Sequence, residues 1–171
     1  MTYYAFLLSY NFSFVVFAGN SICRRLNLLV LNMNVITDSV EISTRGHTDI
    51  VDITPQVERA LGEAELKRGN LTVFVSGSTA GITSIEYEPG LLKDLPEAFE
   101  KLAPTGVTYH HDAAWGDGNG YAHVRAAMLG SSFTVPFDNG KLLLGTWQQI
   151  VVIDFDNRPR KRDVVVQMIG E

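Results

Sequence analysis

Cysteine is nearly absent from this chain of 171 residues, since Cys23 is the only one. An internal disulfide needs two cysteines, so a disulfide framework is excluded. The part of the chain that follows Met33 has no thiol at all. Any metal ligands there must therefore be histidine, carboxylate or amide groups.

Positive charge is also scarce. The sequence has 14 lysine and arginine residues against 19 aspartate and glutamate residues, so its formal net charge is −5. A surface of that sign repels the phosphates of nucleic acids, and we expect no nucleic-acid partner. A local basic pocket can still bind a single phosphate. The length and the 46% hydrophobic content fit one domain with its own core.

The first 32 residues lack acidic side chains and differ in composition from the rest. Their apolar run from Tyr3 to Ala18 is interrupted by polar residues, whereas a membrane span needs about 20 apolar residues. A signal peptide requires a basic segment ahead of the run, and none precedes it. We favour Met33 as the true start, with residues 1–32 an N-terminal extension outside the fold. A membrane or targeting role and an additional ordered element are the alternatives.

The hydrophobic pattern after Met33 predicts both strands and helices. Short runs rich in β-branched and aromatic residues predict strands. These runs cover residues 40–44, 48–52, 71–75, 82–87, 133–137, 141–144, 145–155 and 163–169. Apolar residues at helical spacing predict three helices. The first helix begins at Thr54-Pro55, with Thr54 as N-cap, and ends at Gly69-Asn70. The second covers residues 91–102, with Pro96 restarting the helix, and the third covers residues 124–129.

Turn residues indicate how the strands connect. Arg45-Gly46-His47 is a turn between the first two strands, and Asp138-Asn139-Gly140 predicts a hairpin. The last two strands are predicted to form another hairpin around residues 156–159. Strands and helices without strict alternation indicate the α+β class. We expect residues 33–171 to form a compact single domain with a largely antiparallel mixed β-sheet and two or three helices, cytoplasmic and without a membrane partner.

Residues 109–125 are the segment richest in groups that bind metals or phosphates, and they include three of the four histidines. His111 and His123 can supply neutral imidazole nitrogens to a divalent metal ion. Asp117 can be a third ligand or can orient one of the histidines. Arg125 is always charged and suits a phosphate. The alternative interpretation is a surface loop with incidental histidines.

A second candidate segment, residues 76–86, follows a predicted buried strand. Ser78 and Thr79 lie in a Gly/Ser/Thr loop whose amides and hydroxyls can bind an anion. The loop is not a P-loop, because no Gly-Lys-Ser/Thr follows it. Glu86 can act as a metal ligand or as a general acid or base. An ordinary turn and a surface glutamate are the alternative.

A third candidate segment, residues 145–150, combines a tryptophan with two amides. Trp147 can stack against a planar ligand, and Gln148 can form hydrogen bonds with it. The alternative is a core tryptophan with hydrogen-bonded glutamines. The sequence contains neither a nucleophile elbow nor a Ser-His-Asp order, so nothing indicates a serine nucleophile.

These segments resemble the blocks of a known family. Residues 132–135, Gly140 and Gly145–Ile150 resemble the signature of the YjbQ-like family, described as secondary thiamine-phosphate synthases. Residues 77–86 and 122–125 resemble two further blocks in the same order. The similarity runs from about Met33 to Glu171.

The resemblance implies a compact α+β domain that assembles as a homotrimer. It also implies an enzyme that joins a hydroxymethylpyrimidine diphosphate to a thiazole phosphate and releases pyrophosphate. A divalent metal ion, magnesium or zinc, is the expected cofactor, and a small phosphorylated molecule is the expected substrate. By resemblance, six residues occupy matching positions: Thr83, Glu86, His111, His123, Arg125 and Gln148.

The resemblance and the three segments together give an expected site with three groups of residues. The expected catalytic residues are Glu86, His123 and Arg125. The expected metal ligands are His111, His123 and Glu86. The expected substrate-binding residues are Ser78, Thr79, Thr83, Asp117, Asn119, Trp147 and Gln148.

One position departs from the family pattern. Some relatives carry Gly-His-Ser-His where this chain has Gly120-Tyr121-Ala122-His123, so Tyr121 removes a possible third histidine ligand. Two alternative functions stay open on the sequence. One is a trimeric protein that binds a metal or an anion without efficient turnover. The other is a metal-dependent phosphohydrolase with Glu86 as the base.

Overall fold

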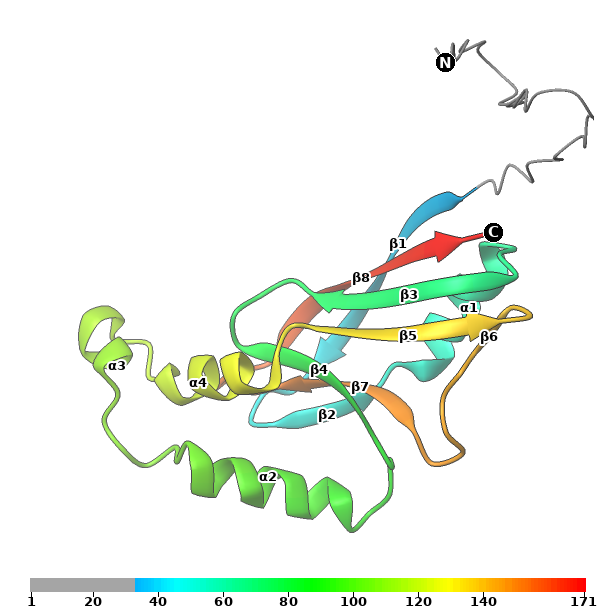
Figure 1. The fold of residues 1–171 in the computed structure, drawn as a ribbon. Coiled ribbons are helices and arrows are strands. Elements are labelled where there is room, and N and C mark those ends of the chain that lie inside the picture. The colour runs from blue at the N-terminus through cyan, green and yellow to red at the C-terminus, as the bar shows by residue number, and fades with distance from the viewer. Residues whose placement is uncertain (1–32) are drawn as a thin grey trace, which may run out of the picture. The chain divides into compact units, whose positions relative to one another are not determined.

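The computed structural model describes residues 33–171 of the chain, so the expectations for residues 1–32 lie outside the described residues. Strands and helices follow one another in mixed order (Figure 1). They are β1 (Asn34–Thr44), β2 (Asp49–Asp52), α1 (Thr54–Glu63), β3 (Arg68–Val75), β4 (Ala80–Ile85), α2 (Leu91–Leu102), α3 (His110–Trp115), α4 (Gly120–Leu129), β5 (Ser132–Asp138), β6 (Lys141–Leu142), β7 (Gln149–Asp154) and β8 (Arg160–Gly170). None of the helices among these residues is long and apolar enough to cross a membrane.

The strands form two sheets. A five-stranded sheet has the order β1-β8-β3-β5-β6, and a three-stranded sheet has the order β2-β7-β4. Every strand pair is antiparallel. The α+β class and the antiparallel pairing are therefore confirmed. The described chain has four helices where two or three were expected, because α3 was not predicted.

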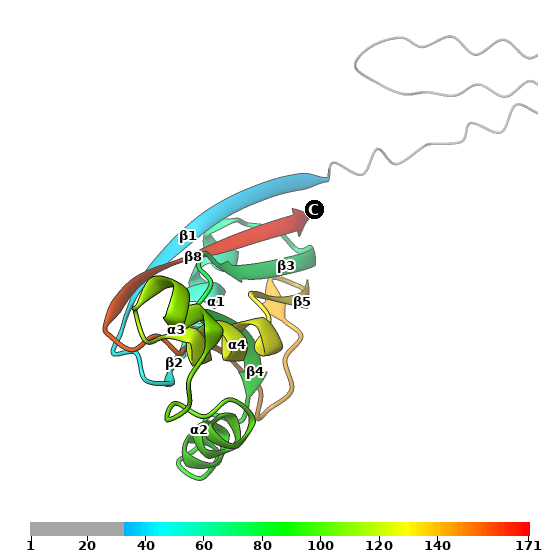
Figure 2. The same ribbon diagram turned by 90° about the vertical axis from the view of Figure 1, so that its left-hand side faces the viewer.

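Strand β7 lies between two hydrophobic cores. Ile150 and Val152 pack into the core between the two sheets, to which α1 also contributes. Val151, Ile153 and Phe155 belong to a second core on the other face of the small sheet, under α2 and α4. A strand that is covered on both faces needs an unbroken apolar run, and β7 has one. Figure 2 views the molecule from the end at which α3 and α4 lie.

The predicted hairpin between residues 145–155 and 163–169 is wrong. Strand β7 lies in the small sheet, whereas β8 lies in the large sheet between β1 and β3. The strands β1 and β2 are likewise in different sheets, although a turn joins them. The two crossings touch, because the His47 amide donates a 2.6 Å hydrogen bond to the Asp156 carbonyl. The β1–β2 connection and the β7–β8 connection, which both pass from one sheet to the other, therefore lie next to each other.

The turn at Asn139-Gly140 is confirmed as a hairpin between β5 and β6. Both turn residues have positive φ, 51° and 69°, as a primed hairpin turn requires. The end of the first helix was predicted too late, since α1 stops at Glu63 and Gly69 already belongs to β3. Thr54 is not the N-cap either, because Ile53 occupies that place. Instead, the Thr54 hydroxyl accepts a hydrogen bond from the Ile150 amide.

Helix α2 continues through Pro96 without restarting. Its apolar stripe is only partly buried, with Phe99 inside the second core and Leu102 exposed. The third predicted helix also begins earlier than expected, at Gly120. This earlier start is important because it places His123 within α4 instead of in a preceding loop.

Candidate functional site

Two short helices bring the predicted histidines together. Helix α3 ends at Trp115 and is capped by Gly116, whose φ of 71° is the left-handed conformation that favours glycine. The chain then turns back into α4. The rings of His111 and His123 consequently lie against each other, with centroids 4.2 Å apart and planes tilted by 32°. His110 is exposed on the first turn of α3.

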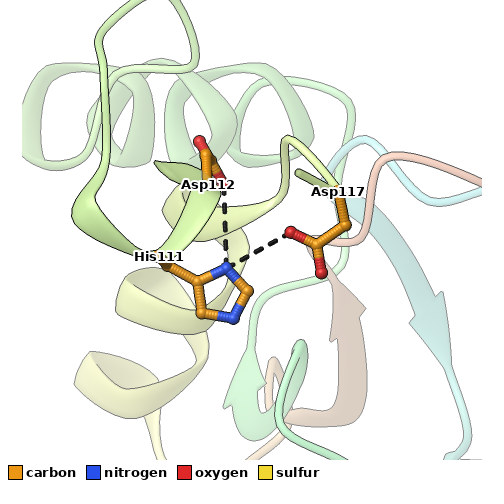
Figure 3. Close-up of side chains that lie close together, drawn as sticks. All are labelled: His111, Asp112 and Asp117. Atoms are coloured by element: carbon orange, nitrogen blue, oxygen red, sulfur yellow. Dashed lines mark ion pairs between the residues drawn. The ribbon is translucent and has the colours of Figure 1, made fainter. Parts of the chain in front are cut away.

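Two carboxylates surround one nitrogen of His111 (Figure 3). The Nδ1 atom lies 3.3 Å from Asp117 Oδ1 and 3.7 Å from Asp112 Oδ1. That nitrogen is buried and has no hydrogen-bond partner among the described residues. A buried polar atom without a partner is uncommon, and one explanation is an ion that belongs there.

The donor set fits a divalent metal ion. Ligand atoms about 2.1 Å from a tetrahedral metal lie about 3.4 Å apart, close to both distances from the His111 nitrogen. One ligand atom from each of His111, Asp112 and Asp117 lies within 4.8 Å of the others. Imidazole nitrogen with carboxylate oxygen is a donor set that suits zinc, and oxygen ligands suit magnesium. His123 lies beside this cluster as a further candidate ligand.

Neighbouring groups fix both carboxylates. The Gly120 amide donates a 2.8 Å hydrogen bond to Asp112 Oδ1. A side chain at Gly120 would collide with Tyr109, whose Cβ would be 2.5 Å from the added carbon. The buried Asn119 side chain, with its amide oriented to donate, lies 3.1 Å and 3.3 Å from the two Asp117 oxygens. Asn119 therefore orients Asp117, which differs from the substrate contact expected of it.

His123 has the protonation state that metal binding needs. Burial lowers the pKa of the His123 imidazole, and the neighbouring His111 lowers it further. Three carboxylates, those of Asp117, Asp156 and Asp112, act in the opposite direction with smaller effect. The ring is accordingly neutral at neutral pH, and a neutral imidazole has a lone pair for a metal.

A buried ionic network, which was not predicted from the sequence, lies beneath the site. Asp154 accepts hydrogen bonds from Arg162 Nε and Nη2 at 2.8 Å and 2.7 Å. Asp156 accepts a 2.7 Å hydrogen bond from Arg160 Nε. Burial would raise the pKa of Asp156, but the bonds from Arg160, from Thr79 and from the Asn157 amide outweigh it and lower that pKa. The sequence signal was charge at alternate positions, Asp-x-Asp and Arg-x-Arg, which point to the same side of an extended chain.

The loop after β3 lies next to His123, as the expected pocket requires. A cavity of about 440 Å³ has Ser78 on one wall and His123 on another. The Thr79 hydroxyl, however, is buried in the ionic network: it donates to Asp156 at 3.1 Å and accepts from Arg162 at 2.7 Å. Of the two expected loop contacts, only Ser78 faces the cavity.

Arg125 lies on the opposite face of α4 from His123. Two residues along a helix turn the side chain by about 200°, so neighbours of this spacing diverge. Arg125 is 2% exposed, and its guanidinium donates to the Ala103 carbonyl, the Thr48 hydroxyl and Glu100. It also lies over the Tyr121 ring, 5.0 Å from the ring centroid. The structure therefore assigns Arg125 internal partners and does not bring it to the histidines.

The remaining expected residues gather at the far end of β4. Glu86 follows β4, Gln148 Nε2 donates a 2.8 Å hydrogen bond to Ser84 Oγ, and Trp147 is 70% exposed. Strand β4 alone is about 17 Å long, at about 3.3 Å per residue, and the histidines lie beyond its other end. Figure 1 shows the two ends, with α3 at the left and the β6–β7 loop at the right. Within one chain, Glu86 is thus not a ligand beside His111, and half-buried Thr83 lies between the two ends.

The chain is similar in sequence to proteins of one family over nearly the whole described domain. A family described as "UPF0047 protein YjbQ-like" matches residues 38–171. A UPF0047 protein of Archaeoglobus fulgidus is 42% identical over 128 residues, which are 75% of this chain and 97% of that protein. The UPF0047 protein YugU of Bacillus subtilis is 34% identical over 134 residues, 77% of this chain and 98% of its own.

Solved structures agree with the sequence match. A YbjQ-like protein of unknown function from Sulfolobus solfataricus superposes with a TM-score of 0.78 at 34% identity, covering 82% of this chain and all of that one. An uncharacterised protein of the yjbq/upf0047 family from Clostridium acetobutylicum gives a TM-score of 0.70 at 34% identity, covering 77% of this chain and 98% of that one. On fold and sequence together, this chain belongs to the UPF0047 YjbQ-like family.

Proposed function

We propose that this chain is a metal-dependent transferase that acts on small phosphorylated molecules. The observation that carries the proposal is the buried His111 Nδ1, which lacks a hydrogen-bond partner among the described residues and faces the carboxylates of Asp112 and Asp117. As the family resemblance implies, the reaction is the thiamine-phosphate synthase reaction. A carbon–oxygen bond to the diphosphate breaks, pyrophosphate leaves with the electron pair, and the thiazole nitrogen forms the new carbon–nitrogen bond.

Each group of residues at the site has a separate role in the proposed reaction. His111, Asp112, Asp117 and His123 would hold the metal ion. A bound divalent ion would offset the negative charge that develops on the departing pyrophosphate. Asn119 keeps the Asp117 carboxylate in place, and the cavity beside His123 is large enough for a small organic substrate.

The proposal includes a homotrimer in which a second copy completes the site. Large apolar side chains are exposed at two opposite ends of the folded domain. Trp115 and Met128 lie near the histidines, and Leu143 and Trp147 lie at the other end. Exposed apolar groups of this size are typical of contact surfaces. Head-to-tail contacts between unlike surfaces close into rings, and such a ring would carry Glu86 and Trp147 of one copy to the histidines of the next.

The proposed reaction also implies a cytoplasmic location. The expected substrates carry several negative charges, which makes unaided passage across a lipid bilayer very costly. A phosphorylated substrate is therefore used in the compartment in which it is made.

Growth and metal content test the proposal together. The wild-type chain and the variants His111→Ala and His110→Ala are expressed in a thiamine auxotroph, and the metal content of each purified protein is measured. We expect metal and growth with the wild type and with His110→Ala, whose side chain is exposed on the same helix. His111→Ala should lose both. Failure of the wild type to support growth, or equal growth with His111→Ala, would contradict the proposal.

A protein that binds a metal or an anion without efficient turnover is the second candidate. The internal partners of Arg125 favour it, because the cation expected to neutralise a diphosphate is not beside the histidines in one chain. Bound metal without growth of the auxotroph would support this candidate. Release of phosphate from generic phosphoesters without growth would support the phosphohydrolase.

A further inference from the structure

The cavity beside His123 has a loop on one wall and a helix on another. The loop contributes Gly77 and Ser78, and the C-terminal half of α4 contributes Ala126 and Ala127. The volume of about 440 Å³ lies within the usual range of about 300–1,000 Å³ for small-molecule sites. The cavity is therefore roomy enough for an organic ligand instead of a lone ion.

The middle of the loop presents backbone donors. The loop is held at both ends, where the Ser76 amide donates to the Asp163 carbonyl at 3.1 Å and the Thr79 carbonyl accepts from Phe155 at 2.9 Å. Between these points, the amides of Gly77 and Ser78 donate to no other residue of the described part of the chain. Consecutive backbone N–H groups in an irregular loop are a common anion-binding arrangement.

A buried guanidinium lies behind the same loop. Gly77 has a φ of 144°, and a Cβ there would come 3.0 Å from Arg162 Nη1. Glycine thus allows the Arg162 guanidinium to approach the loop backbone closely. Nε and Nη2 of Arg162 are bonded to Asp154, which neutralises that carboxylate, and Nη1 is on the side of Gly77.

The two walls of the cavity differ in chemistry. Ser78 adds a hydroxyl to the two amides, whereas Ala126 and Ala127 offer only methyl groups. An inorganic phosphate ion would fill the donor side and leave the methyl side in contact with water. A phosphate attached to a small apolar group satisfies both sides.

We propose that the loop of Gly77 and Ser78 binds the phosphate of a small organic phosphate ester whose apolar part lies against Ala126 and Ala127. This subsite rests on the proposed function for its link to the reaction, because it borders the histidines through His123. It does not need the metal for binding. The substrate class is accordingly a phosphate or diphosphate ester of a compact apolar or aromatic group.

Phenyl phosphate is the probe for the test, measured by isothermal titration calorimetry on the full chain without added metal. Ser78→Asp places a carboxylate in the loop and should weaken binding at least about tenfold through charge repulsion. Ser78→Ala keeps the amide, loses one hydroxyl donor, and should weaken binding about fivefold. Ser39→Asp is the matched control, since this substitution introduces the same charge at an exposed position of β1, away from the cavity.

Binding that is equal in wild type, Ser78→Asp and Ser78→Ala would overturn the subsite, as would no binding by the wild type. Circular dichroism confirms that each variant is folded before its result is counted. Zinc titration of the same proteins separates this inference from the metal proposal. Zinc binding without phenyl phosphate binding would contradict the subsite alone, whereas phenyl phosphate binding by a protein that takes up no zinc in this titration would contradict only the metal proposal.

Discussion

The guanidinium of Arg125 and the carboxylate of Glu100 form an ion pair, with Nη2 2.5 Å from Oε2, that joins α4 to α2. Arg125 is buried, whereas the Glu100 side chain is about half exposed. The same guanidinium satisfies the Ala103 carbonyl. Arg125 therefore ties together the helices that cover the second core.

The first prediction follows from that tie. Arg125→Ala leaves buried acceptors without a donor and should lower the free energy of unfolding by about 3 kcal/mol. Glu100→Gln should cost much less, because about half of its side chain is exposed to solvent and water can replace its partner. Urea unfolding followed by circular dichroism measures both. An unchanged urea midpoint for Arg125→Ala would show that this residue acts elsewhere than in the fold.

The second prediction concerns Tyr121, which stands where some relatives carry a histidine. Positions 121 and 123 face opposite sides of α4, so Tyr121→His should not increase the affinity for zinc measured by titration. The variant should also lose the contact between the Tyr121 ring and Arg125, at a cost of about 1 kcal/mol in unfolding free energy. A clear gain in zinc affinity would mean that residue 121 reaches the metal ligands.

The third prediction concerns Asn119, which donates to the Asp117 carboxylate. Groups that orient a metal ligand typically contribute about 10- to 100-fold in metal affinity. Asn119→Ala should therefore weaken zinc binding by about tenfold, while the far-UV circular dichroism spectrum stays the same. Asn70→Ala, at an exposed position of β3, is the matched control. Equal losses in the two variants would argue against an orienting role.

The fourth prediction is a pH dependence of stability that arises from Asp156. The pKa of this carboxyl is lowered in the folded protein, because hydrogen bonds to Arg160, Thr79 and the Asn157 amide outweigh the opposing effect of burial. A lowered folded-state pKa stabilises the protein above the unfolded value of about 3.9. That stabilisation is lost as the pH falls through the folded-state pKa.

Urea midpoints measured from pH 6 down to about pH 3 test this prediction. The wild-type midpoint should fall more steeply with acid than that of Asp156→Asn, which cannot titrate at this position. Asp163→Asn, on an exposed part of β8, should follow the wild-type curve. Parallel curves for wild type and Asp156→Asn would contradict the assignment.

The fifth prediction tests whether a second copy completes the site. Glu86→Gln and His123→Ala should each be inactive alone in the thiamine auxotroph. When the two are expressed together, about a quarter of the sites in randomly mixed rings combine an intact Glu86 with an intact His123 from the neighbour. We expect growth to return. Mixed rings that native mass spectrometry detects but that support no growth would contradict a shared site.

The sequence alone determined features that depend on near neighbours. The apolar residues of β7 indicated a strand, and Asn139-Gly140 indicated a hairpin, because each follows from the local sequence pattern or backbone conformation. The same is true of the pairing of His111 with His123. A glycine-rich turn between them returns the chain within a few residues, so short-range geometry was sufficient.

Only the tertiary structure decided which distant groups meet. The apolar pattern of β7 and β8 was the same for a hairpin as for strands in separate sheets, and packing of both faces of β7 selected the second. Arg125 was near His123 in sequence, but the helical turn of α4 carried it to the opposite face. Glu86 belonged to the same segment as Ser78, yet the extended β4 holds the two at opposite ends. Periodicity fixes which residues are buried, whereas long-range pairing fixes which functional groups share a site.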